Sequence, residues 1–208
     1  MRHDAWRPCD TPAVREPWAG PVVALVCSAG GLDPLSEVLG ALPGDLAAAV
    51  VVVQHVDPGA RSLLAGILDR RSALDVRPAT TGARLCPGTV LVAPPGSHTL
   101  ATADGELTLI RSGAFPPNRP SADLLLVTLA VTAGARAIAV VLSGRGHDGA
   151  TGATAVHDLG GIVIAATADS SWAPAMPTAA AERDHIVDHV VPVDEIAALV
   201  QDLVSSRI

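Results

Sequence analysis

The stretch PVVALVCSAGG, residues 21–31, decides how the rest of the sequence is interpreted. Its valine-rich apolar run is typical of a strand buried on both faces, and it leads directly into Ser28 and two glycines. A buried strand followed at once by a glycine turn indicates an α/β fold in which a helix begins after the strand. The stretch also raises the question of why such a strand should present a hydroxyl to the turn.

Composition and charge restrict the class of protein. With 208 residues and 49% hydrophobic content, the chain is large enough to bury one sizeable core. The net charge of -7, spread without long acidic runs, provides no basic surface for phosphate backbones or anionic membranes, so we expect neither nucleic-acid binding nor membrane insertion. All 14 basic residues are arginine, and the absence of lysine excludes a phosphate-loop lysine and a Schiff-base lysine.

The N-terminus and the cysteines bear on location and domain boundaries. The segment MRHDAWRPCD is too polar for an export signal, and no apolar stretch is long enough to span a membrane, so we expect a cytoplasmic protein. The three cysteines are isolated and odd in number, which indicates neither a disulfide framework nor a metal site. Residues 1–20 show no periodicity, and we interpret them as a flexible extension before a single domain over residues 21–208.

From residue 21 onward, short Val-, Ile- and Leu-rich runs alternate with helical patterns. This alternation predicts an α/β fold with a doubly wound, mostly parallel sheet and helices on both faces. Strands are expected at residues 22–27, 49–54, 89–93, 137–142, 161–165 and 186–191. Helices are expected at residues 32–42, 60–71, 121–134, 149–159 and 193–205. The segment 98–110 differs, because Asp104-Gly105 between two alternating runs predicts a small antiparallel hairpin at the sheet edge.

Three chemical groups follow predicted strands. Ser28 follows the strand at 22–27, His55 follows the strand at 49–54, and Asp148 lies in the loop after the strand at 137–142. Ligands of open α/β sheets bind beyond the carboxyl ends of the strands, where these loops would meet. A hydroxyl, an imidazole and a carboxylate on separate loops are the components of a Ser-His-Asp hydrolase.

Each of these groups has a definite chemical task. A serine hydroxyl is a poor nucleophile at neutral pH and needs a neutral imidazole, here His55, to take its proton. The imidazole needs an acceptor on its other nitrogen, which Asp148 would supply. The glycines after Ser28 allow a tight turn that leaves backbone N–H groups beside the hydroxyl, so the N–H of Ala29 is a candidate donor to an oxyanion.

Structural explanations exist for the same residues. Ser28 fits a helix N-cap, His55 fits a histidine that bonds to a carbonyl, and Asp148 fits a cap for the helix that follows it. His98 and the stretch NRPSAD at residues 118–123, which contains Arg119, lie on loops that could reach the same rim, and for both substrate contact and simple loop structure are equally good explanations.

Two other kinds of site compete with a triad. The loop at residues 144–149 reads GRGHDG and matches the G-x-G-x-x-G dinucleotide fingerprint, with Asp169 roughly 20 residues further on. Against this hypothesis, Asp148 would put a carboxylate in the turn that must accept a pyrophosphate. Cys27 should point away from Ser28 and is interpreted as a core thiol. The Asp-His pairs within residues 184–189 have no third cluster nearby and indicate no metal site.

Six motifs follow one another along the chain. They are VVALVCSAGG at 22–31, VVVQH at 51–55, VAPPG at 92–96 with His98, RPSAD at 119–123, VVLSGRGHDG at 140–149 and MP at 176–177. In this order they resemble the catalytic domain of the CheB family, the protein-glutamate methylesterases of bacterial chemotaxis. The resemblance covers roughly residues 21–203, and the series is far more specific than any single motif.

The resemblance implies a doubly wound α/β fold, hydrolysis of methyl esters on receptor glutamates, deamidation of receptor glutamines, and no cofactor. It places the nucleophile on Ser28, the base on His55, the orienting acid on Asp148 and an oxyanion donor on the backbone N–H of Arg145. The implied partner is a methylated chemoreceptor-like protein.

Some features depart from the family pattern. The family usually has glycine where Val26 stands, threonine where Ala29 stands and methionine where Arg145 stands. A non-catalytic scaffold that binds a signalling partner is therefore a second hypothesis, and a nucleotide-binding module is a third. A receiver domain, common in the family, does not fit into 20 residues, so constitutive activity, a separate regulator acting in trans and a different pathway all stay open. The aromatic content of 2% provides little for an interface hot spot, so we expect a monomer.

Overall fold

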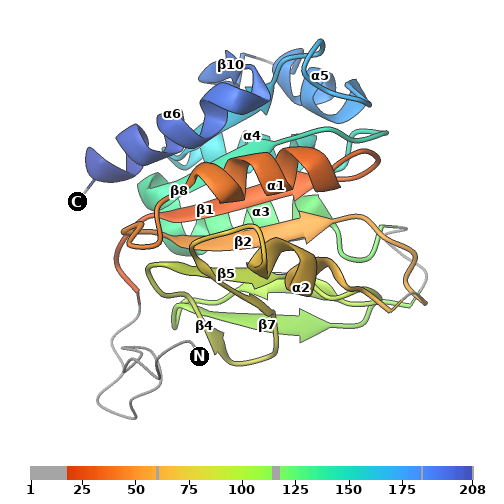
Figure 1. The fold of residues 1–208 in the computed structure, drawn as a ribbon, viewed down its shortest axis with the longest axis vertical. Helices are drawn as coiled ribbons and strands as arrows, with labels where there is room; N and C mark the ends of the chain where they lie inside the picture. The colour runs from red at the N-terminus through yellow and green to blue at the C-terminus, as the bar shows by residue number, and fades with distance from the viewer. Residues whose placement is uncertain (1–17, 60, 114–117, 184, 208) are drawn as a thin grey trace.

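The computed structural model describes residues 18–59, 61–113, 118–183 and 185–207 (Figure 1). The main sheet consists of β1 (Val22–Cys27), β2 (Ala49–Gln54), β3 (Asp75–Pro78), β5 (Thr89–Val92), β8 (Ala137–Val141), β9 (Ile162–Ala166) and β10 (His189–Val191). These strands pair in parallel in the order β10-β9-β8-β1-β2-β5-β3. The chain builds outward from β1 in both directions, so the fold is doubly wound and the strand order reverses beside β1.

Helices cover both faces of this sheet. The apolar sides of α1 (Leu32–Ala41), α2 (Leu64–Asp69) and α6 (Val193–Ser205) pack on one face. Those of α3 (Ala122–Ala133), α4 (Ala150–Asp158) and α5 (Ala175–Ala181) pack on the other, and the 3-10 turn η2 (Gly134–Arg136) joins α3 to β8. The predicted α/β class with helices on both faces is confirmed.

The β1 strand carries no polar side chain because it is buried on both faces. Val23, Leu25 and Cys27 belong to the core under α1, whereas Val22 and the other alternate residues belong to the core under α3. Every residue of β1 is at most 1% exposed. A strand buried on both faces needs an apolar residue at every position, and the first polar side chain can come only where the strand ends, at Ser28.

A second, antiparallel sheet consists of β6 (His98–Ala101), β7 (Glu106–Ile110) and β4 (Ala83–Arg84), in the order β4-β7-β6. The turn between β6 and β7 contains Gly105 with φ +71°, as the Asp-Gly pair predicts. The hairpin is not an addition to the edge of the main sheet, which corrects that expectation. It lies against α3, where the Ala101 N–H donates to Thr128 Oγ1 at 3.0 Å.

The N-terminal boundary of the domain differs from the prediction. Trp18 packs against the core, its indole Nε1–H donates to the Pro21 carbonyl at 3.0 Å, and the Arg136 guanidinium donates to the carbonyls of Trp18 and Gly20. Residues 18–20 therefore belong to the folded domain, and the rest of the predicted extension, residues 1–17, lies outside the described residues.

Two of the three cysteines, Cys27 and Cys86, lie among the described residues. Cys27 is free and buried, whereas Cys86 is disulfide-bonded, which the isolated spacing of the cysteines did not predict. Within the described ranges, no helix is long and apolar enough to cross a bilayer.

Candidate active site

The parallel register of β1 and β2 brings Ser28 and His55 to adjacent strand ends. Cys27 pairs with Gln54 at the last position of the two strands, and the His55 N–H donates to the Cys27 carbonyl at 3.0 Å. The residues that follow, Ser28 and His55, therefore begin two neighbouring loops on the same rim. This is the rim where the strand order reverses, and where open α/β sheets bind their ligands.

His55 and Asp148 form a close pair on this rim. His55 Nε2 lies 2.7 Å from Asp148 Oδ2, and the two side chains are 9% and 11% exposed. Among the described residues the Ser28 hydroxyl has no hydrogen-bond partner, so the structure joins the histidine to the aspartate but not the serine to the histidine. Hydrogen bonds of this kind often form only in the complex with substrate. Nδ1 is the imidazole nitrogen that is left for Ser28.

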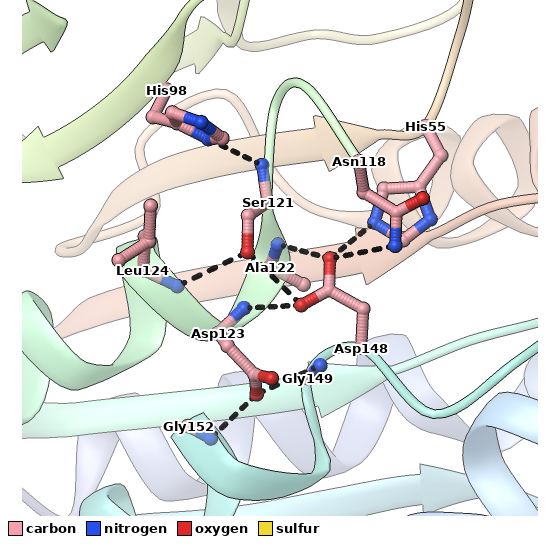
Figure 2. Close-up of polar contacts among 10 residues, drawn as sticks. All are labelled: His55, His98, Asn118, Ser121, Ala122, Asp123, Leu124, Asp148, Gly149 and Gly152. Carbon is pink, nitrogen blue, oxygen red and sulfur yellow. Dashed lines mark hydrogen bonds and ion pairs between the residues drawn. The ribbon is translucent and has the colours of Figure 1, made fainter. Parts of the chain in front are cut away.

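The Asp148 carboxylate lies at the N-terminus of α3 (Figure 2). Oδ2 accepts from the Ala122 N–H at 2.9 Å, and Oδ1 accepts from the Asp123 N–H at 3.0 Å and from the Ser121 hydroxyl at 3.0 Å. The Asn118 side-chain amide adds a longer bond of 3.4 Å to Oδ2. Because the first N–H groups of a helix have no partner within it and carry positive potential, this position suits a buried anion.

These contacts decide the charge of Asp148. Burial by itself raises the pKa of a carboxyl group, but the hydrogen bonds from His55 and from the N–H groups of Asp123 and Ala122 outweigh burial and hold the pKa of Asp148 well below its usual range. The carboxylate is therefore ionised at neutral pH and can stabilise an imidazolium at His55.

Two backbone N–H groups beside Ser28 are available to an anion. Within the described ranges, the N–H groups of Ala29 and Arg145 donate to no protein group, whereas the Ser28 N–H already donates to the Ser143 carbonyl at 2.9 Å. A Cβ placed on Gly144 would lie 2.9 Å from Ser28 Cβ, so the loop that carries Arg145 contacts Ser28 directly. Both donors lie in loops next to Ser28 and are candidates for an oxyanion hole.

Ser143 holds the two loops together. Its hydroxyl donates to the Ala29 carbonyl at 2.9 Å and accepts from the Ala173 N–H at 3.0 Å. The side chain is 1% exposed, which leaves it no contact with solvent. The loop after β1, the loop after β8 and the segment before α5 are therefore tied to one buried hydroxyl.

An exposed tryptophan lies beside these loops. Trp172 is 71% exposed, and the Arg145 guanidinium carbon lies 5.7 Å from its ring centroid, within cation–π range. Two surface grooves meet at this ring. One also contains Gly30, Asp33 and Glu37. The other contains Arg145 together with residues of α5. The rim therefore has an exposed aromatic ring beside a groove, and Gly30, two positions after Ser28 in the chain, lines that same groove.

His98 does not lie where a substrate could reach it. The side chain is fully buried, Nδ1 accepts from the Ser121 N–H at 3.2 Å, and Nε2 lies 2.7 Å from Ser112 Oγ. Burial and the nearby Arg119 lower the pKa of His98, in keeping with a neutral ring that accepts at one nitrogen and donates at the other. The expected substrate contact at His98 is replaced by a role in holding the loop before α3.

Arg119 lies in that same loop. Its carbonyl accepts from the Gly96 N–H at 3.3 Å, and its side chain is half-buried, with no protein partner for Nε among the described residues. A contact between this guanidinium and a substrate stays a prediction.

At the end of the glycine loop at residues 144–149, the N–H groups that would bind a dinucleotide phosphate at the helix start already have a partner. Asp123 Oδ1 accepts from the Gly149 N–H at 2.9 Å and from the Gly152 N–H at 2.7 Å, so a carboxylate of the protein occupies the start of α4. A pyrophosphate needs those N–H groups free. This contact argues against the nucleotide-binding hypothesis.

The remaining candidates have structural explanations. Burial raises the pKa of the Cys27 thiol far above its usual range, so Cys27 is a core residue and a poor nucleophile. In the part of the chain that the structure describes, no three His, Cys, Asp or Glu side chains gather as they would around a metal ion.

Sequence reasoning placed Asn118, Ser121 and Asp123 on a loop that could reach the rim, but it did not predict that they hold Asp148 or its loop. Ser121 could have been found as an N-cap, because a serine before an apolar helix is a common start signal and its hydroxyl accepts from the Leu124 N–H. Nothing in the local sequence indicates that this helix start faces Asp148.

Comparisons with known proteins show the family of this chain. The family model for CheB methylesterase matches residues 23–200. A protein-glutamate methylesterase/protein-glutamine glutaminase of Moorella thermoacetica is 39% identical over 188 residues, which are 88% of this chain and 44% of that protein. One of the same name from Geobacillus kaustophilus is 38% identical over 98% of this chain and 58% of its own length. The chain thus spans about half the length of these relatives.

A solved structure shows the same fold. The crystal structure of the Thermotoga maritima CheB methylesterase catalytic domain superposes with a TM-score of 0.85 at 34% sequence identity. The match covers 89% of this chain and 100% of that domain. The likeness therefore includes the whole of the solved catalytic domain.

Proposed function

Because the chain belongs to the CheB methylesterase family, we propose that it is a protein-glutamate methylesterase whose triad is Ser28, His55 and Asp148. One observation supports this most strongly. The 2.7 Å bond between His55 and an ionised Asp148 lies on the strand end adjacent to Ser28, beside two unpaired backbone N–H groups. Acyl transfer needs this combination of base, orienting acid, hydroxyl and oxyanion donors.

The first half of the reaction forms an acyl-enzyme. Ser28 Oγ attacks the carbonyl carbon of the glutamyl methyl ester while His55 Nδ1 takes the hydroxyl proton. The carbonyl oxygen becomes an oxyanion that accepts from the N–H groups of Ala29 and Arg145. Asp148 holds the imidazole through Nε2 and stabilises its positive charge. The C–O bond to the methoxy group then breaks, and His55 gives its proton to that oxygen, so methanol leaves.

The second half restores the enzyme. His55 takes a proton from a water molecule, whose oxygen attacks the acyl carbon. The bond to Ser28 Oγ breaks, the proton returns to that oxygen, and the glutamate carboxylic acid leaves and ionises in water. A glutamine side chain would follow the same path, with ammonia leaving in place of methanol, and the relatives carry the name glutaminase as well. The steps require no cofactor.

The substrate that we propose is a methylated chemoreceptor-like protein, reached from the cytoplasm. A methyl glutamate is a neutral, flexible side chain, and the exposed ring of Trp172 beside the two grooves offers a surface for the receptor segment that carries it. A monomeric state belongs to the same proposal.

Mass spectrometry of a receptor fragment tests this function. A methyl-esterified chemoreceptor cytoplasmic fragment is incubated with the protein or with Ser28→Ala, digested and mapped peptide by peptide. Loss of the methyl group at defined glutamates with the wild-type protein alone supports the proposal, and conversion of glutamine to glutamate shows the deamidase activity. Unchanged peptides with a folded wild-type protein refute the proposal and favour a non-catalytic scaffold.

A further inference from the structure

Asp123 and Asp148 each accept hydrogen bonds from the start of a helix that lies next to the other aspartate. Asp148 accepts from the Ala122 and Asp123 N–H groups at the start of α3, and Asp123 accepts from the Gly149 and Gly152 N–H groups at the start of α4 (Figure 2). Asp148 therefore caps α3, the helix that contains Asp123. Asp123 in turn caps α4, the helix that begins just after Asp148. We call this arrangement of the two aspartates the reciprocal cap.

The reciprocal cap fixes the peptide next to the catalytic carboxylate. Gly149 follows Asp148 directly, and its φ of +104° is a backbone conformation that side chains with a Cβ rarely adopt. Asp123 Oδ1 holds the N–H of that same peptide at 2.9 Å. The orientation of the Asp148 backbone, and with it the direction of its side chain, depends on this bond.

The packing around the reciprocal cap leaves little freedom to the two helices. A Cβ on Gly152 would lie 2.5 Å from Leu126 Cβ and 3.1 Å from the Asp123 backbone, so α3 and α4 are in close contact at this point. A shift of the α4 start would therefore carry Asp148 with it, away from His55.

We propose that Asp123 is a positioning residue for the triad: its carboxylate oxygen fixes the turn at Gly149 and so holds Asp148 against His55. This inference rests on the proposed function and adds a residue that touches no substrate. Loss of the bond would lower the rate of acyl transfer, because a displacement of about 1 Å in a catalytic group can cost about 10²-fold in rate.

The accepting oxygen of Asp123, and not its charge, carries this role. Burial and the neighbouring Asp148 raise the pKa of Asp123, so the negative charge is unfavourable at this position, whereas two N–H groups need the acceptor. An asparagine keeps a side-chain oxygen at the same place. The proposal therefore predicts that Asp123→Asn retains the function and Asp123→Ala does not.

Reaction of Ser28 with a fluorophosphonate probe tests the proposal without knowledge of the substrate. Wild type, Asp123→Asn and Asp123→Ala are compared for labelling rate, and kcat and KM for the methylated receptor fragment are measured alongside. We expect Asp123→Ala to lose about 10- to 100-fold in labelling rate and kcat with KM within about twofold, and Asp123→Asn to stay within about threefold of wild type. Asp194→Ala, which removes an exposed first-turn carboxylate from α6, is the matched control and should leave both rates unchanged.

Each outcome bears on the positioning role of Asp123 or on the proposed function. An alanine variant that labels at the wild-type rate, or an asparagine variant as slow as alanine, overturns the positioning role. If wild type labels at Ser28 but cleaves no methyl ester, the proposed function fails and the labelling rates still decide the role of Asp123. If wild type does not label, both proposals fall. Should Asp123→Ala not fold, as judged by circular dichroism, Asp123→Ser replaces it, with a hydroxyl that can bond to at most one of the two N–H groups.

Discussion

Asp148 has two tasks, and replacing it by asparagine or alanine separates them. Its carboxylate orients His55 and also satisfies the Ala122 and Asp123 N–H groups at the start of α3. Asparagine keeps one carbonyl oxygen for the helix start and loses the charge that stabilises an imidazolium. Alanine removes both functions. We predict that the two variants lose activity equally but differ clearly in stability.

The magnitudes follow from the contacts. A buried N–H without a partner costs about 1–3 kcal/mol. Asp148→Ala leaves the N–H groups of Ala122 and Asp123 without theirs, and the residual exposure of 11% at this side chain lets water compensate in part, so we expect a loss of about 2–4 kcal/mol. Asp148→Asn keeps one of the two bonds and should lose about 1–2 kcal/mol. For kcat, loss of the charged acceptor should cost both variants about 10⁴-fold.

Urea unfolding followed by circular dichroism measures the stability difference, and methanol release from a methylated receptor fragment measures kcat. The unfolding slopes should agree among the three proteins, so that midpoints convert directly into free energies. Two results would refute the reasoning: an alanine variant as stable as wild type, which would mean that α3 does not depend on Asp148, or an asparagine variant with wild-type kcat, which would mean that the charge at His55 is dispensable.

Three further predictions concern pH, substrate contact and backbone geometry. The pKa of Asp148 is lowered in the folded state, so its contribution to stability is complete above the ordinary pKa of 3.8 and is lost as pH falls below it. The difference in unfolding free energy between wild type and Asp148→Asn, measured by urea unfolding, should therefore narrow below that pH. A difference that does not change with pH would contradict the lowered pKa. Trp172→Ala removes a ring that is 71% exposed, so KM for the receptor fragment should rise with kcat nearly unchanged, and an equal fall in kcat would place the ring in the catalytic step instead. Gly149→Ala forces a Cβ into φ +104° and should cost about 1–3 kcal/mol, seen as a lower thermal midpoint; a midpoint equal to wild type would show that this turn is not strained.

The central strands could be predicted from sequence because their burial is uniform. Residues 22–27 and 49–54 are apolar at nearly every position, and the structure has strands at these same residues, β1 and β2. The α6 helix at 193–205 was also predicted with correct bounds, since its apolar residues recur at helical spacing. Once the strands were parallel and adjacent, the placement of Ser28 beside His55 followed.

Short elements without a periodic pattern were missed. The β3 strand, Asp75–Pro78, contains charged residues and ends in proline at the sheet edge, so no apolar run marks it. The α5 helix, Ala175–Ala181, has a proline at its third residue and is too short for apolar spacing to show. The predicted helix at 60–71 begins only at Leu64, and residue 60 lies outside the described residues.

Within the site, sequence reasoning assigned a role to each member of the proposed triad but none to the residues that hold Asp148. The bonds from Ser121 and the start of α3 to Asp148 join residues 25–27 positions apart in the chain. These residues meet in space only because α3 packs on α4. A serine at a helix start is readable locally, whereas the direction in which that helix start faces depends on tertiary packing. The same reason explains why His98 looked like a substrate contact and is a buried support.

The most direct test of the central claim is methanol release from a methylated chemoreceptor fragment by wild type, Ser28→Ala and His55→Ala under identical conditions. We expect steady release by wild type and a fall of both variants towards the background rate, because the hydroxyl and the imidazole act as one unit. Release that persists in either variant would contradict the triad. No release from a folded wild-type protein would contradict the proposed substrate.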